Sequence, residues 1–276
     1  MNPNLSLAQI SQFMRYWIIT MTSTAGSGHP TSSLSGVELM VQLMHGGFFV
    51  TDYDTNNRAN DRIIFSKGHA SPLFYSMYAA LGQIKPEELL GFRQFDSVLE
   101  GHPTPRFHLT EATTGSLGQG LGIGLGITLG LGLQNLQRRP KVWVLLGDSE
   151  MSEGSVWETM ELAAYHKAVN LIAIVDVNRL GQRGQTMIGH DLENYKGKVE
   201  AFGWEAYLVD DGHDLELIAS VYSKVLASKS DKPKIILAKT IKGKGVSFLE
   251  NINGWHGKTL NPEETQKALA EINYTA

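Results

Sequence analysis

Two apolar segments of this sequence end at the same kind of polar residue, and one helical segment separates them. The first runs from Lys141 to Asp148 and the second from Asn170 to Asn178. Between them, residues 152–166 have the apolar spacing of a helix and a start rich in serine and glutamate. Such a crossover makes the two strands parallel, so Asp148 and Asn178 are expected at the same carboxyl edge of one sheet.

Ligands of open α/β folds bind at this edge of the sheet. A carboxylate and an amide oxygen placed together there are hard oxygen ligands that suit Mg²⁺ or Ca²⁺. Mg²⁺ is usually shared between one or two carboxylates and the phosphates of a ligand. Asp148 and Asn178 therefore predict a metal-anchored diphosphate. The simpler alternatives are a helix cap for Asp148 and a turn residue for Asn178.

The composition excludes several classes of protein. A net charge of −4 gives no basic surface for nucleic acid or an anionic membrane, and the absence of cysteine excludes disulfides and thiolate sites. Arg15 interrupts the first apolar stretch, which argues against a signal peptide, and the longest apolar run, residues 121–133, is too short to span a bilayer. We therefore expect a cytoplasmic protein with no nucleic-acid or membrane partner.

Apolar periodicity predicts an α/β fold in which strands and helices alternate. The expected helices cover residues 5–23, 35–45, 71–81, 117–137, 152–166, 193–202, 215–228 and 262–272. The expected strands cover residues 62–66, 142–146, 171–177, 205–209 and 235–239. This order predicts a mostly parallel sheet with helices on both faces, and a single domain over residues 1–276.

Glycine recurs through residues 118–130. As a helix, this stretch places Gly118, Gly122, Gly126 and Gly130 on one face, since residues four apart share a face. Each internal glycine costs about 1 kcal/mol relative to alanine. We therefore expect this row to pack closely against another backbone or a cofactor. The rival interpretation, a dinucleotide-binding loop, lacks the spacing G-x-G-x-x-G.

Six of the nine histidines lie beside glycine or in a glycine-rich motif. His29, His69, His102, His190 and His213 each follow a glycine, and His256 precedes one. Glycine lets the backbone approach a ligand closely while the neighbouring imidazole points at it. A single Gly-His pair usually marks only a turn.

Several longer motifs, taken in order, resemble the diphosphate-binding half of transketolases. They are Gly-His-Pro at 28–30, Ser-Lys-Gly-His at 66–69, Gly-His-Pro-Thr-Pro at 101–105, Thr-Gly-Ser-Leu-Gly-Gln-Gly at 114–120, Gly-Asp-Ser-Glu-Met-Ser-Glu-Gly-Ser-Val-Trp-Glu at 147–158, Asn-Arg-Leu-Gly-Gln at 178–182 and Trp-His-Gly-Lys at 255–258. The resemblance runs from about residue 27 to 260 and is closest to the animal-type branch. It implies the thiamine diphosphate-binding fold and transfer of a two-carbon ketol unit between sugar phosphates, a reaction of the pentose phosphate pathway and carbohydrate metabolism.

The resemblance also implies the cofactor-side roles. Asp148, Asn178 and the backbone carbonyl of Leu180 would hold Mg²⁺ (or Ca²⁺ or Mn²⁺), which holds the thiamine diphosphate. His69 and Lys242 would lie near the diphosphate, where a cation offsets phosphate charge. The residues expected to line the cofactor are Gly115, Leu117, Gly147, Ser149, Gln182 and His256. Lys242 could equally be a solvated loop lysine, and Leu117 an ordinary core residue.

On the substrate side, the resemblance implies catalytic roles for His29, His102, His256 and Glu153. A donor sugar needs its hydroxyl groups held and a proton removed to break its C2–C3 bond, which suits histidine near neutral pH. Purely structural histidines are the alternative. Glu153 matches a glutamate at the interface that joins two cofactor sites; its alternative is a glutamate favoured by the dipole in a first helical turn. The remaining histidines match no catalytic position.

The sequence departs from the family pattern in two ways. Ser149 replaces a glycine, and a serine would be strained there if that position needs a positive φ. The family glutamate that protonates the aminopyrimidine belongs to a second, pyrimidine-binding domain, and neither that domain nor the C-terminal one has a counterpart here. The resemblance therefore predicts the N-terminal subunit of a split transketolase. A C-terminal subunit would supply the missing domain and glutamate, in a heterotetramer.

Two further interpretations remain open. One is a subunit of another thiamine diphosphate enzyme, such as a 2-oxoacid dehydrogenase E1 component or a deoxyxylulose phosphate synthase. The other is a non-catalytic cofactor-binding or regulatory subunit, or a fragment of a longer protein, since a fold alone does not fix a function. The three substrate-side histidines together favour transketolase.

Overall fold

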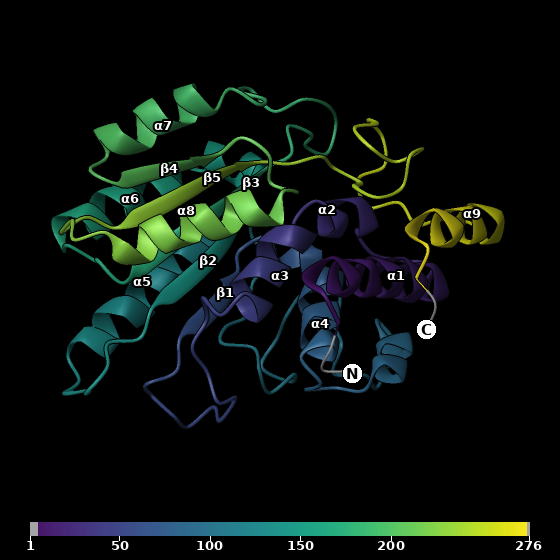
Figure 1. The fold of residues 1–276 in the computed structure, drawn as a ribbon, viewed down its shortest axis with the longest axis horizontal. Helices are drawn as coiled ribbons and strands as arrows, with labels where there is room; N and C mark the ends of the chain where they lie inside the picture. The colour runs from purple at the N-terminus through teal and green to yellow at the C-terminus, as the bar shows by residue number, and fades with distance from the viewer. Residues whose placement is uncertain (1–4, 275–276) are drawn as a thin grey trace.

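A parallel five-stranded sheet forms the centre of this computed structural model, which describes residues 5–274 (Figure 1). Its strand order is β1-β2-β3-β5-β4, and every neighbouring pair is parallel. The strands are β1 (Arg62–Phe65), β2 (Val142–Gly147), β3 (Leu171–Val177), β4 (Glu205–Val209) and β5 (Lys234–Lys239). The chain thus crosses over repeatedly, and all five strands end at the same edge.

Helices cover both faces of this sheet. The α-helices of residues 5–274 are α1 (Leu7–Ala25), α2 (Pro30–Leu34), α3 (Val37–His45), α4 (Ser71–Ala80), α5 (Gln119–Gly132), α6 (Gly154–Tyr165), α7 (Leu192–Ala201), α8 (Leu215–Ala227) and α9 (Pro262–Ile272), of which α9 packs on α1 rather than on the sheet. Three short 3₁₀ helices are η1 (Gly68–Ala70), η2 (Pro86–Gly91) and η3 (Asp148–Ser152). The predicted α/β fold, with a parallel sheet between two helical layers, is confirmed.

The two sides of each strand enter two separate hydrophobic cores. Along β2, Trp143 and Leu145 pack with α1, α3, α4 and α8, whereas Val142, Val144 and Leu146 pack with α5, α6 and α7. Successive side chains of a strand point to opposite faces, so both faces of this sheet need apolar residues. This explains why the strands read as continuous apolar runs rather than as alternating patterns.

The structure differs from the expected elements mainly at helix ends. The first helix starts after Ser6 rather than at residue 5, because Ser6 Oγ accepts from Gln9 N–H and Gln9 Oε1 accepts from Ser6 N–H in a capping box. Helix α2 was not expected, since five residues are too few to show periodicity. Helix α5 ends at Gly132, short of the expected residue 137, where Leu133 is 90% exposed and has no core to join.

One prediction extends beyond the residues that the structure describes. The single domain predicted over residues 1–276 includes residues 1–4 and 275–276, which lie outside the described residues, and it stays a prediction. Within residues 5–274, no helix combines the length and apolar character needed to cross a membrane.

The close-packing row predicted on α5 is wrong for two of its four glycines. A Cβ atom placed on Gly126 or Gly130 would meet nothing within 4 Å. The tight contacts lie instead at Gly120 and Gly124, where a Cβ would come within 2.5 Å of Ser66 Cβ and 2.6 Å of Val144 Cγ2. Helix α5 is therefore packed closely against Ser66, which follows β1, and against the middle of β2, by a glycine pair that the sequence row did not include.

Replacing Gly120 and Gly126 by alanine should therefore change stability in opposite directions. Gly120→Ala forces a Cβ into the Ser66 backbone and should cost about 1–3 kcal/mol of unfolding free energy. Gly126→Ala removes a flexible residue from an open helix position and should gain up to ~1 kcal/mol. Urea denaturation of the two variants measures this, and shifts of the same sign would contradict the packing described here.

Candidate functional site

A pocket of about 230 Å³ lies at the carboxyl edge of the sheet. It gathers side chains from the segments that follow β1, β2, β3 and β5 and from the turns before α2 and α5. The predicted site residues that line it are His29, His69, His102, Gly115, Leu117, Gly147, Asp148, Ser149, Asn178, Leu180, Gln182, Lys242 and His256. The structure thus places them together, and their roles remain predictions.

Asp148 and Asn178 meet because their strands are neighbours in register. Gly147 of β2 pairs with Asp176 of β3, so the residues that follow these strand ends lie side by side. Asp148 Oδ2 accepts a hydrogen bond from the backbone N–H of Arg179 at 2.6 Å, and this bond joins the two strand ends. Arg179 has a φ of 63°, a left-handed conformation that turns the chain sharply before Leu180.

The donor set at these strand ends fits a hard divalent cation. It comprises one carboxylate, the side-chain amide of Asn178 and the carbonyl of Leu180, and Mg²⁺ would complete its shell with phosphate and water oxygens. Burial, together with the charge of nearby Asp176, raises the pKa of Asp148 to about 6, although the charges of Lys67 and Lys242 act in the opposite direction. Lys242 Nζ donates to the Leu180 carbonyl at 2.8 Å, and the second lone pair of this oxygen would be available to a metal. Within residues 5–274, no group of three His, Asp or Glu side chains is placed to hold a metal by itself.

Three imidazoles pack together in the same pocket as these oxygen donors. The ring centroids of His29, His69 and His256 lie 5.1–5.4 Å apart. Burial is the largest cause of their lowered pKa values, which fall to about 4 for His29 and about 3 for His256, where Lys242 adds its positive charge. Lys242 Nζ donates to His256 Nδ1 at 2.9 Å, so the proton of this neutral ring is on Nε2.

His102 approaches the same pocket across the backbone of Gly115. A Cβ on Gly115 would lie 3.2 Å from the His102 ring, and Gly115 has a φ of 157°. The glycine therefore leaves room for the imidazole. Burial, and to a smaller extent the charge of Arg93, lowers the pKa of His102, so this ring is also neutral at pH 7.

A buried ion pair that we did not predict adjoins the pocket, and Lys67 is one of the residues that line it. Lys67 Nζ contacts Asp176 Oδ2, and both side chains are almost completely buried. Asp176 also accepts hydrogen bonds from Ser35 Oγ at 2.6 Å and from Thr240 Oγ1. Burial alone would raise the pKa of Asp176, but the Lys67 ammonium and these hydrogen bonds hold it below its ordinary value. The available sequence signal was a charged residue inside the apolar run of β3.

Glu150 is a second buried carboxylate that the sequence analysis missed. Its Oε1 accepts from Ser66 Oγ at 2.5 Å and from Gly118 N–H at 2.8 Å, and its Oε2 accepts from Gly147 N–H at 2.7 Å. These bonds tie the ends of β1 and β2 to the start of α5. Burial raises the pKa of Glu150.

Two other charged residues differ from the predicted set. Glu153, predicted to be catalytic, forms the N-cap of α6 and does not line the pocket, so its role at a subunit interface stays a prediction. Arg93 was not predicted. It has a φ of 57°, donates to Ser27 Oγ at 3.0 Å and, after burial, is the largest cause of the lowered pKa of His29.

Ser149 replaces a family glycine, and a positive φ would have strained it. It is not among the residues with positive φ.

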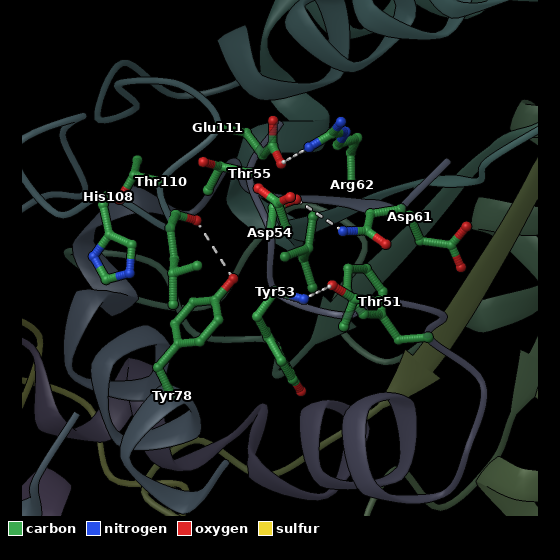
Figure 2. A pocket seen from close by; sticks show the side chains of 14 residues that line it. Thr51, Tyr53, Asp54, Thr55, Asp61, Arg62, Tyr78, His108, Thr110 and Glu111 are labelled. Atoms are coloured by element: carbon green, nitrogen blue, oxygen red, sulfur yellow. Dashed lines mark hydrogen bonds and ion pairs between the residues drawn. The ribbon is translucent and has the colours of Figure 1, made fainter. Parts of the chain in front are cut away.

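A second pocket, of about 130 Å³, lies near the start of β1, at the opposite edge of the sheet (Figure 2). Figure 2 shows one ion pair between its side chains, and hydrogen bonds that join other side chains to the backbone. Arg62 pairs with Glu111 at 3.1 Å, and the Tyr78 hydroxyl donates to the Leu109 carbonyl. None of the predicted site residues lines it. The first pocket is therefore the candidate functional site.

Removing one member of the buried pair should destabilise the protein strongly. Asp176→Ala leaves Lys67 buried without its partner, which should cost about 3–5 kcal/mol of unfolding free energy. Adding Lys67→Met to the same chain should recover much of this loss, because no unpaired charge remains. Asp231→Ala, which breaks an exposed ion pair with Lys167, is the matched control and should change the urea midpoint little. No recovery in the double variant would show that the pair's charges are not what matters.

Comparisons with known proteins identify the family. The family model described as transketolase, thiamine diphosphate binding domain, matches residues 7–275. The chain is 40% identical to human transketolase over 267 residues, which are 97% of this chain and 42% of the human protein. It is 41% identical to transketolase-like protein 2 of Bos taurus over 266 residues, which are 96% of this chain and 42% of that protein.

Solved transketolases have the same fold. A Campylobacter jejuni transketolase superimposes with a TM-score of 0.87 at 32% identity, covering 98% of this chain and 43% of its own. A Pichia stipitis transketolase in complex with sedoheptulose 7-phosphate gives a TM-score of 0.89 at 28% identity, covering 98% of this chain and 41% of its own. The chain therefore spans less than half the length of these relatives. It belongs to the transketolase family and corresponds to the thiamine diphosphate binding domain of that family.

Proposed function

We propose that this chain binds thiamine diphosphate through a divalent metal ion and takes part in the transfer of a two-carbon ketol unit between sugar phosphates. The observation that carries this proposal is the pocket itself. In a chain of the transketolase family, one pocket gathers the oxygen donors Asp148 and Asn178, the ammonium of Lys242 and four neutral histidines. Oxygen donors and an ammonium suit a metal diphosphate, and neutral imidazoles suit the hydroxyl groups of a sugar.

The chain's part on the cofactor side is to hold and orient. Asp148, Asn178 and the Leu180 carbonyl would hold Mg²⁺, and His69 and Lys242 would lie beside the diphosphate. When bound, the cofactor supplies the stabilisation of negative charge on carbon that ketol transfer requires. Gly115, Leu117, Gly147, Ser149 and Gln182 would contact the rest of the cofactor.

On the substrate side, His29, His102 and His256 would bind the donor sugar and move its protons. A neutral imidazole has one donor and one acceptor nitrogen, so it can hold a hydroxyl group or accept its proton. His29 Nδ1 is buried without a hydrogen-bond partner, which leaves it capacity for a ligand. We assign the removal of the C3 hydroxyl proton, as the C2–C3 bond breaks, to His29 or His102, since His256 Nδ1 already accepts from Lys242 and its Nε2 can only donate.

We further propose that a second polypeptide completes the enzyme. This chain matches 42% of the length of human transketolase, and the family glutamate that activates the cofactor belongs to the pyrimidine-binding domain. A C-terminal transketolase subunit would bring this domain and its glutamate to the pocket. Two copies of each subunit would then form a heterotetramer by closed symmetry.

A ketol-transfer assay tests this proposal most directly. Xylulose 5-phosphate and ribose 5-phosphate are supplied with Mg²⁺ and thiamine diphosphate, first to this chain alone and then to its mixture with a C-terminal transketolase chain. We expect product only in the mixture. Product from the chain alone would contradict the two-subunit arrangement. No product in the mixture, with thiamine diphosphate still bound, would contradict ketol transfer between these sugars.

Two substitutions should separate cofactor binding from turnover. Asp148→Ala removes the carboxylate from the proposed metal ligands Asp148, Asn178 and the Leu180 carbonyl. It should abolish Mg²⁺-dependent binding of thiamine diphosphate in calorimetric titration. His102→Ala should leave this binding intact and lower turnover by about 10²- to 10⁴-fold, as expected for a lost acid–base group. His108→Ala, outside this pocket, is the control for both measurements. Normal turnover of His102→Ala, or an unchanged affinity of Asp148→Ala, would remove that residue from the site.

A further inference from the structure

Three side chains that are distant in the sequence form a buried network next to the loop of residues 240–246, which carries Lys242. Arg15 comes from α1, Glu38 from α3, and His213 from the turn before α8. Arg15 Nη1 and Nη2 donate to the two oxygens of Glu38 at 2.5 and 2.7 Å, and His213 Nδ1 lies 2.8 Å from Glu38 Oε2. The three side chains are at most 9% exposed, and none of them lines the cofactor pocket.

The network reaches the loop through two hydrogen bonds to its backbone. The N–H of Ile241 donates to His213 Nε2 at 2.9 Å, and Arg15 Nε donates to the carbonyl of Lys244 at 3.0 Å. These two positions enclose Lys242, whose side chain runs into the pocket. The network therefore holds the backbone on both sides of the residue that contacts His256.

The hydrogen bonds fix the protonation of each member. Since His213 Nε2 accepts from Ile241 N–H, the ring proton is on Nδ1 and is donated to Glu38. Glu38 accepts from both Arg15 and His213, which requires its carboxylate form. Burial alone would raise the pKa of Glu38, but the Arg15 charge and these hydrogen bonds lower it to about 2. Such a fully paired buried network has one well-defined geometry.

We propose that Arg15, Glu38 and His213 are positioning residues, which align Lys242 with His256 and the Leu180 carbonyl from outside the pocket. The loop backbone turns at Gly243 and Gly245, which have φ of 80° and 91°, and glycine restricts the backbone less than any other residue, so hydrogen bonds from neighbouring groups have to fix its conformation. Thr31 and Asn251 hold the loop by backbone hydrogen bonds at Gly243 N and the Lys242 carbonyl, but within residues 5–274 the only partner of Ile241 N–H is His213. The inference rests on the proposed role of Lys242 beside the cofactor.

Two substitutions of His213 separate its contact with the loop from its contact with Glu38. The side-chain oxygen of His213→Gln reaches about as far as Nε2 and can accept from Ile241 N–H. The amide of His213→Asn corresponds to Nδ1 and can donate to Glu38, but it is too short to reach the loop. The positioning role therefore predicts that His213→Gln preserves the conformation of the loop and that His213→Asn does not.

Hydrogen–deuterium exchange of residues 240–246 in the cofactor-free 276-residue chain is the first measurement. His213→Asn should accelerate exchange by about tenfold, and His213→Gln should stay within about twofold of the unsubstituted chain. In Mg²⁺, His213→Asn should also weaken thiamine diphosphate binding by about tenfold. His166→Asn, at an exposed histidine following α6, is the matched control and should change neither quantity.

The outcomes distinguish this inference from the proposed function. Equal exchange in the asparagine and glutamine variants, or lower melting temperatures with unchanged exchange, would overturn the positioning role. Should His213→Asn fail to fold, Arg15→Lys keeps the charge but cannot pair with both oxygens of Glu38 and also reach Lys244; it should accelerate exchange, and unchanged exchange would overturn the role. Failure of the unsubstituted chain to bind thiamine diphosphate would contradict the proposed function, while the exchange comparison would still decide the network.

Discussion

The ion pair between Lys67 and Asp176 is the interaction on which the pocket depends. Burying two charges is costly, and the cost is offset only when geometry and additional hydrogen bonds are good. Here Ser35 and Thr240 donate to Asp176, and Lys67 also donates to the carbonyl of Ser32. One carboxylate thereby joins the segments that follow β1 and β5 to the turn between α2 and α3, and all of them contribute to the pocket wall or adjoin it.

On the side of α5, the buried carboxylate of Glu150 joins separate segments of the chain in the same way. It fixes the backbone of Gly118 and Gly147 by hydrogen bonds, so a buried carboxylate holds the chain on both sides of the pocket. Hydrogen bonds from the protein itself therefore hold the buried charges next to the pocket in a defined position. Preorganised donors and cations of this kind are more effective in a site shielded from water than mobile groups would be. Neutral histidines lie beside them in the same pocket.

The sequence predicted the fold better than the packing of its helices. All five strands were predicted to within one residue at each end, because strands buried on both faces are apolar throughout. The glycine row on α5 was half wrong, because this helix is apolar or glycine on all sides and its sequence does not show which face meets the sheet. Gly118, with a φ of 83°, precedes the helix, and the contacts with Ser66 and Val144 select Gly120 and Gly124 instead.

The sequence by itself determined the order of the elements and the polar residues at the strand ends. Parallel crossovers then bring Asp148, Asn178 and Lys242 to one edge, whatever the details of packing. Only the tertiary structure decided which buried charges pair. Lys67 and Asp176 are 109 residues apart, and Glu38 and His213 are 175 apart. A hydrogen bond depends on distances of a few tenths of an ångström, which the packing of the helices on the sheet sets and no local sequence pattern records.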